Sequence, residues 1–219
     1  VLGPDTILGH CIYVNTHSAI SRPGDDLGLI AESGTSVSHS PLKFLYGGAL
    51  MESFQRYLDR GVNMTIGTDV YPSDVQLEMR VASLAGKLVE RDGTKIRTAD
   101  LYNAATLGGA RALRRDDIGR LSVGARADLI IVDLNNVDVG PVYDPIRALV
   151  HYCTARDIET VMVDGAILVD GHQMVGVDEE RLMAEAWPIY EILRRELAAR
   201  NWNRPALDEM FPPALPVRN

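Results

Sequence analysis

Residues 62–69, Val-Asn-Met-Thr-Ile-Gly-Thr-Asp, form a run typical of a β-strand, and the run ends on a carboxylate. Two upstream segments share this design: residues 6–10, Thr-Ile-Leu-Gly-His, and residues 35–39, Thr-Ser-Val-Ser-His. The polar end residues of the three runs are 29 and then 30 positions apart. The pattern therefore predicts a strand-and-helix unit that recurs with nearly constant length.

Helical signals lie between these runs. Asp25 or Asp26 can cap a short helix that Gly34 ends, and residues 50–58 carry apolar side chains at helical spacing. A further apolar stripe follows the third run and consists of Leu77, Val81, Leu84, Ala85 and Leu88. This alternation of strands and helices predicts an α/β fold.

Two α/β architectures fit the alternation. In a (β/α)8 TIM-type barrel each unit has about this length, and catalytic residues follow the carboxyl ends of strands, as His10, His39 and Asp69 do here. A doubly wound open sheet alternates in the same way, but no glycine-rich phosphate loop follows a strand in this chain. The barrel is therefore the preferred prediction.

The pattern changes near Asp116, where β-type runs replace the helices. These runs cover residues 118–123, 127–133, 160–163 and 166–169. Asp164-Gly165 separates the last two runs and is typical of a β-hairpin turn. Because crossover helices are absent, these strands predict a small β-domain rather than further barrel units.

A long helix and an arm are predicted after this β-domain. Asp178 can cap a helix from Glu179 to about Arg200, which Pro188 should bend or interrupt. The four prolines after residue 203 predict an extended arm that lies on the body or on a partner.

Composition restricts the class of protein. With 46% hydrophobic residues the chain is globular, and 22 basic against 30 acidic residues give a formal charge of −8. A surface of that sign repels phosphate backbones and anionic lipid, which argues against nucleic-acid and membrane-surface binding. Two cysteines are too few for a disulfide framework and fit a reducing compartment, most simply the cytoplasm.

The three end residues are the candidates for chemistry. Asp69 can ligate a divalent metal or take a proton from metal-bound water. His10 and His39 occupy equivalent strand ends, where an imidazole can bind metal, hold the attacking water or stabilise negative charge. His17, in the loop after the first run, is expected to be an ordinary loop residue. The carboxyl ends of parallel strands meet at one edge, so we expect His10, His39 and Asp69 to converge.

The chain also resembles the C-terminal half of the amidohydrolase superfamily. The closest branch contains S-adenosylhomocysteine, guanine and cytosine deaminases together with triazine aminohydrolases and chlorohydrolases. Residues 9–11 resemble the segment that ends the sixth barrel strand, residues 37–43 the seventh, and residues 66–69 the eighth. Residues 105–113 are similar to the helix after the barrel, and residues 118–129 to the return into the flanking β-sandwich.

This resemblance implies three segments. Residues 1–115 would be the C-terminal part of a metal-dependent hydrolase barrel, with strands six to eight. Residues 116–177 would be β-sandwich strands with a connecting segment, and residues 178–219 a C-terminal helix and proline-rich arm.

The resemblance also implies an activity. It is hydrolytic deamination, or dechlorination, of a nitrogen heterocycle by water that one Zn²⁺ or Fe²⁺ ion activates. Asp69 would bind the metal and accept the proton of that water, His10 would hold the water and stabilise the tetrahedral adduct, and His39 would line the substrate pocket.

Part of the family's metal site is missing from this sequence. The family uses a His-x-His pair and a His-x-x-Glu segment, and neither pattern occurs here. The expectation is therefore that the remaining metal ligands lie outside this chain, in the missing N-terminal half of the same enzyme, and that this segment alone is inactive. The long C-terminal helix and the arm favour a homodimer.

Two alternatives remain open at this stage. A ring-opening cyclic amidase shares the barrel and the metal chemistry, and the release of ammonia rather than formation of a carboxylate would separate the two. A non-catalytic assembly module would bind no stoichiometric metal. His10, His39 and Asp69 all end strand-like runs at nearly constant spacing, which argues against a non-catalytic module.

Overall fold

The structure is a computed structural model that describes residues 1–215, so the end of the predicted arm, residues 216–219, lies outside the described residues. Two units divide the chain, Val1–Gln173 and Met174–Asn219. The strands are β1 (Ile7–Gly9), β2 (Ser36–His39), β3 (Asn63–Ile66), β4 (Leu129–Val132), β5 (Ile158–Val163), β6 (Ala166–Asp170) and β7 (Gln173–Met174). The helices are α1 (Asp26–Ser33), α2 (Pro41–Tyr46), α3 (Phe54–Asp59), α4 (Val75–Glu90), α5 (Thr98–Asn103), α6 (Gly109–Ala112), α7 (Pro145–His151), α8 (Glu179–Arg200) and α9 (Leu207–Met210), with a π-helix η1 (Ala104–Gly108) and a 3₁₀ helix η2 (Ala155–Asp157).

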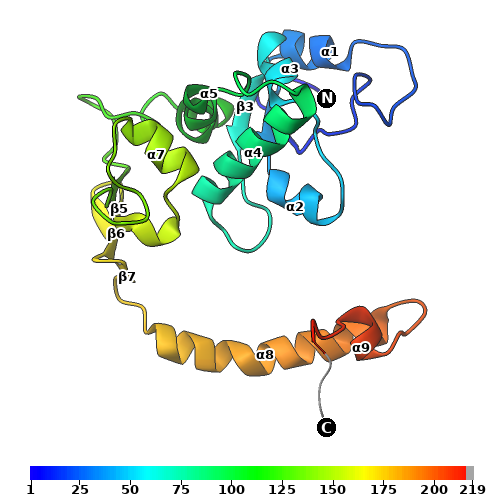
Figure 1. Ribbon diagram of the computed structural model, residues 1–219, viewed down its shortest axis with the longest axis vertical. Coiled ribbons are helices and arrows are strands. Elements are labelled where there is room, and N and C mark those ends of the chain that lie inside the picture. The colour runs from blue at the N-terminus through cyan, green and yellow to red at the C-terminus, as the bar shows by residue number, and fades with distance from the viewer. Residues whose placement is uncertain (216–219) are drawn as a thin grey trace. The chain divides into compact units, whose positions relative to one another are not determined.

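The first three strands form a parallel sheet in the order β1-β2-β3. Leu8 pairs with Val37, and Val37 pairs with Met64. The three strand predictions and the α/β class are confirmed, and the helices α1 to α4 alternate with these strands along the chain. Figure 1 labels these four helices and β3. Within residues 1–215 the sheet does not close into a barrel.

The core of the first unit lies against this parallel sheet. The side chains of Val37 on β2 and Met64 on β3 are buried, and so are those of Phe54 and Tyr57 on α3. Each large apolar side chain of this kind stabilises the fold by about 1.5–3 kcal/mol on burial. The Tyr57 hydroxyl donates a hydrogen bond of 2.5 Å to the Cys11 carbonyl, so the core is tied to the chain just beyond β1.

Helix α1 follows the sequence signals closely. Asp25 caps it by accepting from the Gly28 N–H, and Gly34 ends it in the left-handed conformation. The prediction for this helix is confirmed.

The orientation of α4 differs from the prediction. The apolar stripe chosen from the sequence is not the buried face: Leu84 and Leu88 are exposed, and the other three members are only half-buried. The buried positions of α4 are instead Gln76, Glu78, Met79, Ala82, Ser83 and Gly86. Small residues let the helix approach closely: a Cβ at Gly86 would lie 2.8 Å from Ile96 Cγ1. Close packing, not hydrophobicity alone, selected the buried face.

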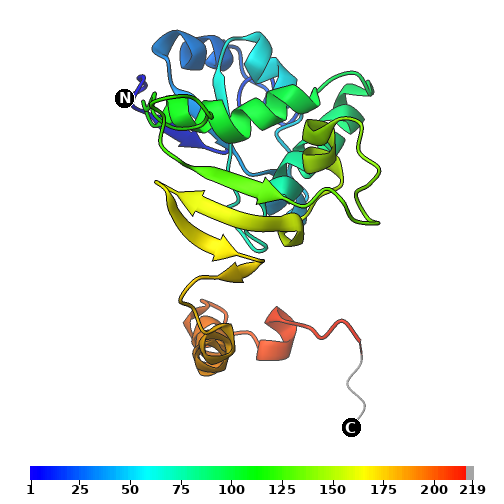
Figure 2. The same cartoon turned by 90° about the vertical axis from the view of Figure 1, so that its left-hand side faces the viewer.

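The second half of this unit is an antiparallel sheet in the order β4-β5-β6-β7, drawn from green to gold in Figure 2. The hairpin at Asp164-Gly165 joins β5 to β6 as predicted. The strand predicted over residues 118–123 is wrong, because these residues form bends and a turn. Gly119 has a φ of 79°, the neighbouring side chains are mostly exposed, and within residues 1–215 the run joins neither sheet.

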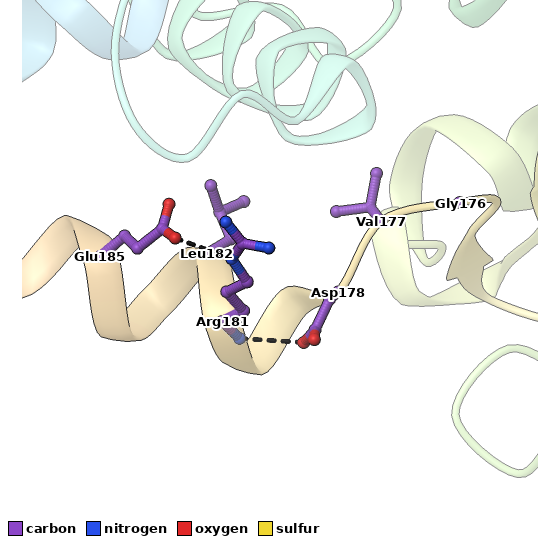
Figure 3. A pocket seen from close by; sticks show the side chains of 6 residues that line it. All are labelled: Gly176, Val177, Asp178, Arg181, Leu182 and Glu185. Carbon is purple, nitrogen blue, oxygen red and sulfur yellow. Dashed lines mark hydrogen bonds and ion pairs between the residues drawn. The ribbon is translucent and has the colours of Figure 1, made fainter.

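The unit that begins at Met174 is dominated by α8. Asp178 caps this helix by accepting from the Arg181 N–H, and Arg181 forms an ion pair with Glu185 at 2.7 Å (Figure 3). The helix runs without interruption through Pro188, contrary to one part of the prediction. The region predicted as an extended arm contains the short helix α9, and the Arg194 guanidinium of α8 lies 5.8 Å from the centre of the Phe211 ring just after α9.

Two further observations concern this part of the chain. Many apolar side chains of α8 are exposed, among them Leu182, Trp187, Ile189 and Leu193. Among the described residues, no helix combines the length and the apolar character that crossing a membrane would require.

Candidate active site

The three predicted site residues lie at the carboxyl ends of adjacent strands. Hydrogen bonds continue the sheet beyond its last paired residues: the His10 N–H donates to the Ser38 carbonyl at 2.8 Å, and the Gly67 N–H donates to the His39 carbonyl at 2.9 Å. The central strand β2 therefore holds the segments that follow both of its neighbours. A sheet hydrogen bond thus fixes His10 itself, and another fixes the chain at Gly67, two residues before Asp69.

His10 and Asp69 are brought together across the end of β2. The His10 Nε2 atom lies 3.5 Å from an Asp69 carboxylate oxygen. Their strands are not neighbours, so the two backbones are separated by about twice the 4.8 Å strand spacing, and only their side chains meet. Both side chains are partly open, with 32% and 39% of their surface exposed. The pair can therefore reach a molecule that approaches this edge.

Both residues adopt an uncommon backbone conformation. His10 has a φ of 65° and Asp69 a φ of 60°, in the left-handed region that costs a residue with a Cβ roughly 1–2 kcal/mol. Such conformations concentrate at functional sites, where the surrounding structure holds them in place.

Gly67 allows β2 and the segment after β3 to approach each other closely. A Cβ at this position would lie 2.9 Å from the Ser38 Oγ and 3.1 Å from the Ser40 Oγ. A larger residue at this position would require the hydroxyl groups of Ser38 and Ser40, on either side of His39, to turn away.

His39 lies behind the pair and is almost inaccessible, with 4% of its surface exposed. Its ring is 5.8 Å from the Phe54 ring, and the His10 ring is itself packed edge-on against Phe44 at 4.5 Å. Burial, with a smaller contribution from the nearby His10, lowers the pKa of His39 from 6.5 to about 3. His39 is therefore a neutral imidazole at physiological pH.

This neutral state predicts an acid-sensitive fold. Between pH 6.5 and pH 3 the unfolded chain binds a proton at His39 that the folded chain does not bind, so the free energy of unfolding falls as the pH is lowered through this range. His39→Asn should remove about 1–2 kcal/mol of the difference in the free energy of unfolding between pH 7 and pH 5. Urea unfolding at the two pH values measures it.

The parent chain, measured under the same conditions, is the reference for this comparison. Equal pH dependence in the parent chain and in His39→Asn would contradict the assignment of a neutral, buried His39.

Glu78 is a buried acid that the sequence analysis did not identify. It is fully buried, its Oε2 accepts from the Leu42 N–H at 3.0 Å, and its Oε1 has no hydrogen-bond partner within the described residues. Burial, followed by repulsion from Asp69 and Asp74, raises the pKa of Glu78 to about 7. No pattern marked it, because a carboxylate on a helix is normally solvated.

The pair has donors of the type that a divalent metal uses. A carboxylate and an imidazole suit zinc or iron, and the His10 Nδ1 atom is buried without a hydrogen-bond partner in the described part of the chain. Catalytic zinc normally has three protein ligands. No group of three or more possible ligands occurs among residues 1–215, so the pair fits part of a metal site and not the whole.

Comparison with known proteins gives the family. The amidohydrolase family pattern matches residues 1–168. A 5-methylthioadenosine/S-adenosylhomocysteine deaminase of Acetivibrio thermocellus is 32% identical over 196 residues, which are 87% of this chain and 43% of the relative. A 5'-deoxyadenosine deaminase of Methanosarcina mazei is 32% identical over 202 residues, or 90% of this chain and 44% of the relative. The chain thus spans less than half the length of these curated relatives.

Solved structures show the same partial match. An adenosine deaminase from Xanthomonas campestris with bound zinc superposes with a TM-score of 0.79 at 29% identity, covering 88% of this chain and 43% of that one. A zinc complex of atrazine chlorohydrolase from Arthrobacter aurescens gives a TM-score of 0.70 at 26% identity, covering 84% and 40%. Since the family pattern covers most of the sequence, this chain belongs to the amidohydrolase family.

Proposed function

We propose that this chain supplies part of the active site of a metal-dependent aminohydrolase, which hydrolytically removes the exocyclic amino group of an adenosine-type heterocycle. The observation that carries the proposal is the His10–Asp69 pair, 3.5 Å apart at the carboxyl edge of the parallel sheet. The curated relatives named above, both deaminases of adenosine-type compounds, support this reaction. A triazine with chloride as the leaving group is the alternative substrate, supported by the likeness to atrazine chlorohydrolase.

The proposal includes an architecture. Strands β1, β2 and β3 would be strands six, seven and eight of a (β/α)8 barrel, and β4 to β7 would belong to the flanking β-sandwich. The remaining metal ligands would come from a polypeptide segment outside this chain that corresponds to the other part of the relatives. A cytoplasmic homodimer stays our prediction for the assembled enzyme.

Each side chain would have a distinct task. Asp69 would bind the metal and accept the proton of the attacking water on a carboxylate oxygen. His10 would hold that water through Nε2 and then stabilise negative charge on the tetrahedral adduct of the substrate. His39, with its ring neutral and nearly buried, would form the back of the pocket behind the pair. A bound Zn²⁺ or Fe²⁺ ion would lower the pKa of water towards neutrality, so that hydroxide is available.

Ammonia release from 5'-methylthioadenosine and 5'-deoxyadenosine tests the function. The 219-residue chain alone, with Zn²⁺ or Fe²⁺ added, is expected to show no turnover. The reconstituted enzyme, defined as this chain expressed with the part of the Xanthomonas campestris deaminase that it does not match, is expected to bind zinc and release ammonia.

Three outcomes would contradict the proposal. Turnover by the chain alone would refute the placement of the remaining ligands elsewhere. A reconstituted enzyme that binds zinc, releases no ammonia from either nucleoside and instead opens the ring of an added cyclic amide such as dihydrouracil to a carboxylate would indicate a cyclic amidase. A reconstituted enzyme without stoichiometric metal would favour a non-catalytic module.

A further inference from the structure

The loop between β1 and α1 is long for an α/β unit. It comprises residues 10–25, whereas the loops that join strands to helices usually have about 2–6 residues. Loops of this length are typically functional when they are ordered. Figure 1 shows this segment in blue, leading into α1. Because the loop begins at His10, its conformation bears directly on the candidate site.

The loop is fixed to the body of the unit at both ends. Near β1, the side chains of Ile12 and Val14 are buried, and the Tyr57 hydroxyl holds the Cys11 carbonyl. Near α1, the Asn15 backbone N–H donates to the Asp26 carboxylate at 2.7 Å, and the Asn15 side-chain oxygen accepts from the Asp26 N–H at 2.9 Å, so the loop is tied to the start of the helix.

His17 fixes the middle of the loop. Its Nε2 atom lies 2.9 Å from the Leu50 carbonyl oxygen, and its Nδ1 atom lies 3.0 Å from the Ala19 backbone nitrogen. A carbonyl can only accept and a backbone N–H can only donate, so Nε2 carries the proton and Nδ1 does not. The two contacts thus place the ring proton on Nε2. The side chain is 9% exposed.

Two further contacts join the long loop to the same region, one to the loop before α3 and one to α3 itself. The Ser18 N–H donates to a Glu52 carboxylate oxygen at 3.1 Å, and Arg56 donates to the Thr16 carbonyl at 3.1 Å. Leu50 and Glu52 lie in the loop of residues 47–53, which follows α2 and therefore belongs to the unit that begins with β2. We name these contacts, together with those of His17, the loop clasp.

We propose that His17 is a positioning residue, which through the loop clasp joins the loops of the β1 and β2 units into one fixed wall beside His10 and His39, and so determines how tightly the heterocyclic substrate is held. The inference rests on the proposed function for its substrate. His10 begins the long loop, the clasp joins this loop to the loop after α2, and α2 follows His39 on β2. The two histidines are therefore linked through both loops as well as through the sheet. A wall fixed before binding has less conformational freedom to lose when substrate arrives.

Hydrogen exchange in the 219-residue chain tests the clasp itself. His17→Phe keeps a ring of similar size but removes both hydrogen bonds. Amides of residues 11–24 and 47–53 are expected to exchange about tenfold faster in this variant, while amides of β1, β2 and β3 keep their rates. His172→Phe, which removes the contact of His172 with the Ile158 carbonyl outside both loops, is the matched control.

Kinetics of the reconstituted enzyme test the positioning role. His17→Phe is expected to raise KM about tenfold and to change kcat less than threefold, because the wall would contribute equally to binding the substrate and the transition state. His17→Gln, whose amide can still donate to the Leu50 carbonyl, is expected to have a KM between those of the unchanged enzyme and His17→Phe. A role in overall stability alone would not produce this split or this recovery.

The outcomes separate this inference from the proposed function. If amide exchange in both loops were unchanged in His17→Phe, the clasp would not exist. If kcat fell by as large a factor as KM rose, or if neither changed, the positioning role would be wrong. Absence of ammonia release by the reconstituted enzyme with the unchanged chain would refute the proposed function and with it the positioning role, while the exchange result would still decide whether the clasp exists.

Discussion

Asp69→Asn is expected to lower ammonia release by the reconstituted enzyme about 10³-fold or more, because the variant loses both the anionic metal ligand and the group that accepts the proton of water. Asparagine has nearly the same shape as aspartate and adopts the left-handed conformation about as readily, so the φ of 60° at this position is no obstacle. The loss should therefore come from chemistry and not from unfolding. Steady-state ammonia release and the zinc content of the purified protein are the two measurements.

Asp74 provides a matched control five residues further along the chain. It caps α4 by accepting from the Leu77 N–H at 2.9 Å, and a second oxygen accepts from the Ala155 N–H at 3.2 Å. Asparagine caps helices about as well as aspartate, so Asp74→Asn should change turnover by less than about threefold. If Asp69→Asn retained activity within tenfold of the unchanged enzyme, the proposed role of this carboxylate would be wrong.

Gly108→Ala is expected to destabilise the fold by on the order of 3 kcal/mol. Gly108 ends the π-helix η1, and a Cβ there would lie 2.2 Å from the Met64 carbonyl oxygen on β3. Neither atom is at the end of a flexible side chain, so the π-helix and the strand would have to separate. Asn63, which donates to the Gly108 carbonyl at 3.1 Å, would lose its partner as they part.

The neighbouring glycine supplies the comparison. Gly109 is helical, with a φ of −60°, and a Cβ there would have no atom within 4 Å. Gly109→Ala should therefore be neutral or stabilise the fold by up to about 1 kcal/mol, through helix propensity. Urea unfolding of both variants measures the difference. If the two variants had equal stability, the close contact between η1 and β3 would not exist in solution.

Gly108→Ala should also affect the candidate site. Asp69 follows β3 by three residues, so a displaced strand would move its carboxylate away from His10. We therefore expect the structural change at Gly108 to reach the candidate site through the strand itself.

Local signals predicted several elements correctly, and their success has a physical basis. Asp25 and Gly34 bound α1, Asp178 begins α8 and Asp164-Gly165 turns the hairpin, because each depends on hydrogen bonds or backbone conformations within a few residues. The strand predicted over residues 118–123 was wrong for the opposite reason. Their strand-like composition is local, but a strand needs a partner, and the described part of the chain pairs no strand with them.

The candidate site was predicted only in part. Regular spacing indicated that His10, His39 and Asp69 follow strands, but spacing does not give the 3.5 Å between His10 and Asp69 or the burial of His39. Glu78 went unrecognised because its burial depends on the face that α4 turns inward. His17 was expected to be an ordinary loop residue, because its partner Leu50 lies 33 positions away and no pattern links the two.

The sequence by itself determined the alternation of strands and helices, the ends of the capped helices and the three polar residues that follow β1, β2 and β3. These features depend on interactions between residues close together in the chain. Only the tertiary structure decided which face of α4 is buried, which acid is enclosed beside Asp69 and which loop His17 holds. Those outcomes depend on packing between distant segments, where the volume of a small residue such as Gly86 or Gly108 outweighs the hydrophobicity of its neighbours.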